Sequence, residues 1–288
     1  MKNVSLVLVS VGLAVAATVG AGADSKIQQR TQMKMEGLAG GVAGLLGGRS
    51  AREGTVTTIA IKGDRRMSTT EATAELVDLA AEKIYRIDLR GKTYTVRTFD
   101  EIRKQIEKAE SRVGGDDARA RRDSKQPEME FDVDIRKTGQ KKTIAGYPCE
   151  QIIMTLTGHE KGKTVDQGGG MVLTSDMWMA ARVPAVQDSR AFAIRYAQKL
   201  YGSALPSMQA AGQAMTAYPG VAGAMARMEK EGTKLDGTPI LTTMTVSAGG
   251  ASRDKALSTI FTTVTEVLTI EGSADAADVE IPAGFRQK

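Results

Sequence analysis

The sequence predicts an α+β protein built on an antiparallel, twisted sheet or half-barrel of about nine strands, with helices covering one face. Several segments alternate apolar and polar side chains, most clearly Met129–Ile135, and this is the period of a half-buried strand. Short turns such as residues 90–92 join consecutive strands, which favours antiparallel pairing. Two regions, Phe99–Val113 and Asp188–Gly232, are helical in pattern. Since each alternating strand has one apolar face, we expect the helices to cover that face.

The N-terminal residues 1–23 have the features of a secretory signal peptide. Lys2 supplies the positive start, Val4 to Val19 is uncharged, and residues 21–23 (Ala-Gly-Ala) fit the small-residue cleavage pattern. An uncleaved anchor is the alternative, but a membrane-spanning helix needs about 20 apolar residues. We therefore expect an exported protein, periplasmic or secreted, with a mature chain that starts near Asp24 and has no transmembrane helix.

Residues 24–54 show no clear period. Met33–Glu36 has the composition of a strand start, while Leu38–Gly48 is apolar and rich in glycine. We expect a flexible N-terminal segment over 24–54; a segment that touches lipid or a partner is the alternative. The remaining residues, 55–288, have the length of a single α+β envelope domain.

The first part of that domain, residues 55–96, is predicted to form consecutive hairpins. Thr55–Ile61 is rich in β-branched residues, Leu76–Leu79 is short and apolar, and Ile84–Leu89 alternates before the turn into Thr93–Val96.

A helix is predicted over Phe99–Val113. Apolar residues recur there at spacings of three and four, and Thr98 with Glu101 forms a capping box at its start. The charged stretch 116–126 that follows has no apolar residue, so we expect a solvated loop there.

Five further strands are predicted after this loop: Met129–Ile135, Cys149–Thr157, Gly170–Ala180, Thr238–Ser247 and Ile260–Ile270. By alternation, one face of the fourth carries Ile240, Met244 and Val246. One face of the fifth carries Ile260, Val264, Leu268 and Ile270.

The helical region Asp188–Gly232 contains many Ala, Gly and Met residues and few large side chains. Four of its methionines are the predicted ligand-lining residues: Met208, Met215, Met225 and Met228. Methionine adapts to irregular apolar surfaces, so this region is either ordinary core or the lining of an apolar cavity.

Several classes of function have little support in the composition. The net charge of +5 is interspersed and aromatic residues are only 4%, which argues against nucleic-acid binding. His159 and Cys149 are the only residues of their kinds, too few for a structural zinc site, and nothing in the sequence brings them together as a catalytic pair. We therefore predict no catalytic residue, no metal and no cofactor; alternating methionines such as Met177 and Met179 suit copper(I) chemically, but core packing explains them better.

A set of short motifs resembles a family of exported bacterial domains of unknown function, which is similar in turn to the periplasmic lipoprotein carriers. The motifs are Lys92-Thr93-Tyr94, Thr98-Phe99-Asp100-Glu101, Ile144-Ala145-Gly146-Tyr147-Pro148-Cys149, Gly237-Thr238-Pro239, Thr265-Glu266-Val267 and Ile281-Pro282-Ala283-Gly284-Phe285. The resemblance runs from about residue 54 to the end, and it implies an unclosed β-barrel covered by helices and a role in the envelope. It carries over no catalytic residue.

The leading hypothesis is a non-enzymatic envelope protein that binds a lipid or a lipoprotein acyl chain on an apolar, concave sheet face. The alternative is a structural or protein-interaction module, with an envelope protein as partner and a fully packed core. An enzyme is the third reading. A cavity beside the sheet distinguishes the first from the second.

Overall fold

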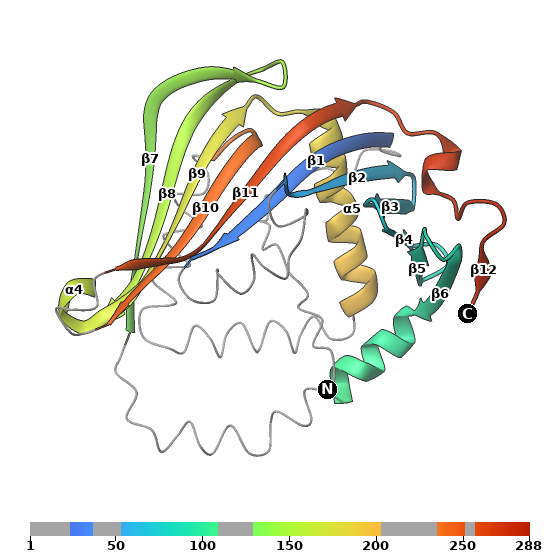
Figure 1. Cartoon of the computed structure of the whole chain (residues 1–288), viewed down its shortest axis with the longest axis horizontal. Helices are drawn as coiled ribbons and strands as arrows, with labels where there is room; N and C mark the ends of the chain where they lie inside the picture. The colour runs from blue at the N-terminus through green and yellow to red at the C-terminus, as the bar shows by residue number, and fades with distance from the viewer. Residues whose placement is uncertain (1–23, 37–52, 109–128, 203–234, 251–256) are drawn as a thin grey trace.

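One large, strongly curved sheet dominates the molecule (Figure 1). The computed structural model describes residues 24–36, 53–108, 129–202, 235–250 and 257–288. The sheet has 12 strands in the order β12-β6-β5-β4-β3-β2-β1-β11-β10-β9-β8-β7 and does not close, because β12 and β7 stand at opposite ends. All neighbours are antiparallel except β12 and β6, which are parallel.

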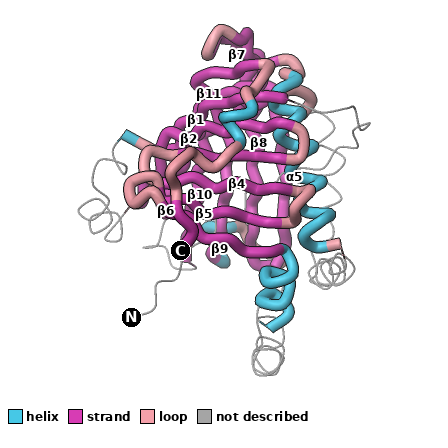
Figure 2. Tube along the Cα trace, turned by 90° about the vertical axis from the view of Figure 1, so that its right-hand side faces the viewer, coloured by secondary structure: helices cyan, strands magenta, loops and turns pink. Residues whose placement is uncertain are grey.

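The strands differ in length between the two halves of the sheet. The shorter ones are β2 (Thr55–Lys62), β3 (Arg65–Thr69), β4 (Thr73–Asp78), β5 (Lys83–Asp88), β6 (Thr93–Thr98) and β12 (Arg286–Gln287). The longer ones are β1 (Asp24–Met35), β7 (Met129–Ile144), β8 (Tyr147–Glu160), β9 (Gly169–Ala180), β10 (Thr238–Gly250) and β11 (Ser258–Glu271). Figure 2 shows the strands as successive rungs with helix α5 alongside them.

The helix α5 (Pro184–Tyr201) lies inside the curve of the sheet and packs mainly on β1 and β2 (Figure 1). Proline at the start suits the helix, since the first turn leaves its backbone N–H groups unbonded. Phe192 and Leu200 of α5 are buried against Ile61 and Val77 of the sheet. We call the sheet face that α5 covers the inner face.

A second helix covers the short-stranded half, as predicted from the sequence. It begins at Phe99 and is described over residues 99–108. Its capping box is present: the Glu101 amide donates to Thr98 Oγ1 at 3.2 Å, and the Thr98 amide donates to Glu101 Oε2 at 2.8 Å. Phe99 is buried in the same cluster as Phe192.

Three expectations need correction. The sheet has 12 strands rather than about nine, since β1, β3 and the two-residue β12 carry no sequence pattern strong enough to mark them. The described residues are mostly strand, so mostly-β describes the fold better than α+β. Residues 24–35, which we expected to be flexible, form β1, and pairing with β2 and β11 on both sides stabilises this strand despite its polar composition.

The structure gives partial information on the predicted signal peptide and on membrane-spanning helices. Residues 1–23, the predicted signal peptide, lie outside the described residues, as does most of the predicted flexible segment, 37–52. In the described ranges, no helix combines the length and the apolar character that crossing a bilayer requires.

Candidate functional site

The register of the long strands shows which side chains share the inner face. Ile27 of β1 lies opposite Ile59 of β2, and both belong to the core that α5 covers. Because side chains alternate along a strand, Met33 and Met35 project from β1 on the same face as Ile27. Their partners on β11 are Thr263 and Phe261.

Following the register from β1 to β7 gives rows of neighbouring side chains that run across the sheet. One inner-face row contains only apolar residues: Met35, Phe261, Val246, Leu173, Leu156 and Val133. The next row is Met33, Thr263, Met244, Ser175, Met154 and Ile135. Neighbouring strands lie about 4.8 Å apart, so these side chains form one continuous, largely apolar surface.

The opposite face of the same strands is more polar, although it also carries Val172, Ile153 and Val264. One residue along from the apolar row stands the outer-face row Lys34, Thr262, Thr245, Thr174, Thr155 and Asp134. The hydroxyls of Thr245 and Thr262 lie 3.4 Å apart. At the level of these two rows the sheet is therefore amphipathic, with the apolar side facing inward.

The apolar rows are only partly covered. Met33 and Met35 are 36% and 44% exposed, while Val246 is 7% exposed. Met171, in the next inner-face row beside Gly158 and Ala248, is 42% exposed. The other apolar members of the two rows are half-buried. Exposed apolar patches that are contiguous mark binding surfaces more often than isolated apolar residues do.

The predicted face of β11 needs correction here. Ile260 and Val264 do not share the inner face with Ile270. The pairing of β11 is irregular beside Gln28/Gln29 of β1 and beside Val246/Ser247 of β10. Each β-bulge adds one residue, which changes the face that later residues occupy. Inner-face positions of β11 are Phe261, Thr263, Thr265 and Val267 instead.

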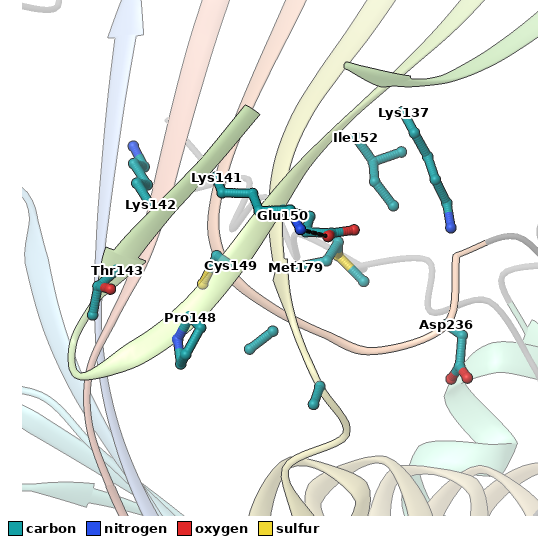
Figure 3. A pocket seen from close by; sticks show the side chains of 12 residues that line it. Lys137, Lys141, Lys142, Thr143, Pro148, Cys149, Glu150, Ile152, Met179 and Asp236 are labelled. Atoms are coloured by element: carbon teal, nitrogen blue, oxygen red, sulfur yellow. Dashed lines mark ion pairs between the residues drawn. The ribbon is translucent and has the colours of Figure 1, made fainter. Parts of the chain in front are cut away.

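A pocket of about 570 Å³ lies where the inner face meets the β7–β8 hairpin (Figure 3). Ile152 and Met179 form part of its apolar wall, together with Cys149 and Pro148. Ile152 belongs to the row next to that of Met154, because it pairs with Met177 of β9. The pocket therefore continues the apolar surface toward the hairpin.

Charged side chains line the same pocket. Lys141 Nζ forms an ion pair with Glu150 Oε1 at 3.0 Å, and Asp236 Oδ1 accepts from Arg182 Nε at 2.6 Å. The hydrogen bond from Lys141, and then its charge, lower the pKa of Glu150. Lys142 Nζ lies 3.9 Å from the centroid of the Trp178 ring and points away from Glu150 (Figure 3).

Lys137 differs from these cations. It pairs across the ladder with Ile152 and therefore projects from the inner face, two residues beyond Ile135. No ion pair joins it to a described residue, but its charge adds to the lowering of the Glu150 pKa. One lysine that makes no direct ion pair thus lies at the hairpin end of the apolar rows.

Cys149, at the hairpin end of β8, is a free thiol and only 2% exposed. Its Sγ donates to the Tyr147 carbonyl at 3.3 Å. Burial raises the pKa of the thiol, against smaller lowering effects of a backbone hydrogen bond and of Lys142. A buried thiol with a raised pKa is a poor nucleophile, so we expect Cys149 to have a structural role.

We expect Cys149→Ser to lower the free energy of unfolding by about 1–2 kcal/mol, because a buried hydroxyl is costlier than a thiol even with one hydrogen bond kept. Urea denaturation measures the loss. The native thiol should react with a thiol reagent only after unfolding. Fast reaction of the native protein would contradict a buried structural thiol.

His159 lies near the other end of β8, in the strand that also contains Cys149. Ten residues of continuous strand separate them by about 33 Å, so β8 holds the two side chains apart. Nε2 lies 3.0 Å from Asp132 Oδ2, and Nδ1 lies 3.1 Å from the Glu160 carbonyl oxygen. Each ring nitrogen thus has an acceptor. The pKa of His159 is raised, and the main cause is the hydrogen bond to Asp132.

This pair predicts a stability that depends on pH. Because the folded pKa is raised, the pair stabilises the protein fully below the ordinary histidine pKa of about 6.5, and the contribution is lost as the pH rises through the folded pKa. We expect Asp132→Asn to destabilise the protein by up to about 1 kcal/mol near pH 5.5, and less near pH 9. Urea denaturation at both pH values tests this, with Asp134→Asn on the same strand face as control; equal losses at both pH values would exclude the pair as the cause.

The four predicted ligand-lining methionines, Met208, Met215, Met225 and Met228, lie outside the described residues. Lys137 and the rows from β1 to β7 were not predicted from the sequence to be parts of one surface. The alternation of Met129–Ile135 was the available signal, and its continuation by two residues reaches Lys137.

Comparison with known proteins adds no relative. No protein-family model and no curated protein sequence matches the chain. The similarity to exported domains and lipoprotein carriers therefore stays a prediction from short motifs, and the function is argued from the inner face alone.

Proposed function

We propose that this chain is a non-enzymatic protein of the bacterial envelope that binds the acyl chain of a lipid or lipoprotein against the inner face of its sheet. The observation that carries the proposal is the apolar row from Met35 to Val133, which crosses β1, β11, β10, β9, β8 and β7 without a polar residue. An acyl chain offers only methylene groups, so it needs a surface of this kind and no hydrogen-bonding partner.

The extent of the surface fits one acyl chain. From Phe131 to Lys137, β7 spans roughly 20 Å at about 3.4 Å per residue. The hydrocarbon core of a bilayer is about 30 Å thick, so a chain from one leaflet reaches about half of that. Export, as expected from residues 1–23, would bring the protein to the compartment where lipids and lipoproteins cross between membranes.

The partial exposure of the rows also supports binding. Met33, Met35 and Met171 are flexible and polarisable, and each is more than one-third exposed. Methionine adapts to apolar ligands of varied shape. An interaction module with a fully packed core, the alternative reading, has no need for exposed apolar side chains on the side toward its own helix.

The test is a titration of the purified full chain with a fluorescent fatty-acid analogue, competed by an unlabelled long-chain alcohol that carries no charge. We expect saturable binding with one dominant site and displacement by the alcohol. Native mass spectrometry of protein from the periplasm should show co-purified lipid. Absence of saturable binding of both the analogue and the alcohol would exclude the acyl-binding function and favour the interaction module.

A further inference from the structure

The residue that follows the apolar positions on β7 is a cation. Phe131, Val133 and Ile135 occupy the inner face of β7, and Lys137 comes next on the same face. Its neighbour across the ladder is Ile152, a buried residue in the wall of the 570 Å³ pocket. A ligand lying along these strands would therefore meet apolar side chains first and an ammonium group at the hairpin end.

The other cations near this pocket have partners. Lys141 is paired with Glu150, Arg182 with Asp236, and Lys142 with the ring of Trp178. Three lysines and two acids line the pocket, and Arg182 pairs with one of these acids, so Lys137 and Lys142 are the two lining lysines without an ion pair. Lys137 is the pocket lysine for which the described residues provide neither an ion pair nor an aromatic ring.

We propose that Lys137 binds an anionic headgroup and that the ligand of the inner face is a free fatty acid, whose carboxylate lies in this pocket while its chain lies on the apolar rows. This inference rests on the proposed function and adds to it the chemical class of the ligand. A carboxylate needs only one cation, and Lys137 is the lysine without an ion pair that projects from the inner face. The two acids, Glu150 and Asp236, would repel the second charge of a phosphate monoester.

The experiment compares two ligands of equal chain length, palmitate and hexadecanol, below their critical micelle concentrations. Both compete with a fluorescent acyl probe for the purified full chain. We expect wild-type protein to bind palmitate roughly tenfold more tightly, the factor for one hydrogen bond to a charged group. Lys137→Met should abolish this preference and leave the affinity for hexadecanol unchanged. Lys137→Arg should retain the preference, because the charge remains.

Lys142→Met is the matched control, since it removes the same charge from the same hairpin but from a side chain that contacts Trp178. It should keep the preference for palmitate. Lys137 is exposed, so the thermal unfolding midpoint of each variant should match that of wild type and exclude misfolding as the cause.

The outcomes separate the two proposals. Equal binding of palmitate and hexadecanol by wild-type protein overturns the headgroup site and leaves acyl binding intact. Binding of neither ligand overturns acyl binding itself. A preference that survives Lys137→Met, or disappears equally in Lys142→Met, overturns the assignment to Lys137. Tighter binding of lysophosphatidic acid than of palmitate would identify a phosphate site and overturn the choice of a carboxylate.

Discussion

Phe192→Ala is expected to lower the free energy of unfolding by about 3–5 kcal/mol, the usual loss when a buried phenylalanine is truncated. Phe192 is fully buried between α5 and the sheet, in contact with the cluster that includes Ile61 and Val77. The change removes this contact area and leaves a cavity between the two elements. It also removes the ring whose centroid lies 5.5 Å from the guanidinium carbon of Arg66.

Arg66 adds to the expected loss. Burial lowers the pKa of this arginine, and its Nε has no hydrogen-bond partner in the structure. The charge of Glu75 and the faces of Phe192 and Tyr196 compensate for this burial. Removing one of them leaves a buried cation with less stabilisation, which is costlier than loss of apolar contact alone.

Urea denaturation followed by circular dichroism measures the effect. Ile194→Ala is the matched control, since Ile194 lies on the same helix and is 37% exposed; its cost should stay below about 1 kcal/mol. A loss below about 1 kcal/mol for Phe192→Ala would mean that α5 does not pack against the inner face as described.

Leu173→Asp is expected to weaken acyl-chain binding by at least about tenfold, because a carboxylate in the middle of an apolar row must lose its water when a chain binds. Leu173 pairs with Leu156 on one side and Val246 on the other. Titration with the fluorescent fatty-acid analogue measures the loss, and Leu156→Asp should reproduce it.

The control is Thr174→Asp, the next residue of β9, whose side chain projects from the outer face between Thr155 and Thr245. It introduces the same charge into the same strand and should leave binding within about twofold. Met171→Asp provides a variant for which folding is not at risk, because Met171 is 42% exposed on the inner face. If inner-face and outer-face variants bind alike, the ligand does not lie on the inner face.

Much of the local structure followed from the sequence alone. Strict alternation in Met129–Ile135 predicted a half-buried strand and the face that Val133 shares with Ile135. The capping box of Thr98 and Glu101 predicted the start of a helix, and the spacing of Phe192, Tyr196 and Leu200 predicted another. Such features depend on side-chain period and on hydrogen bonds within a few residues, so they can be read without the partner strands.

The face that β11 buries, the place of β1 and the role of Lys137 were decided only by the tertiary structure. Bulges opposite neighbouring strands reverse the alternation of β11, and no local pattern marks them. β1 is polar in composition and is stabilised by pairing on both sides. Lys137 lies at the pocket because β7 pairs with β8, which places it opposite Ile152. In each case the outcome depends on pairing between strands that are far apart in the chain, or on a shift in the register of that pairing. The energy of such pairing depends on residues outside the short sequence segment from which a strand is predicted.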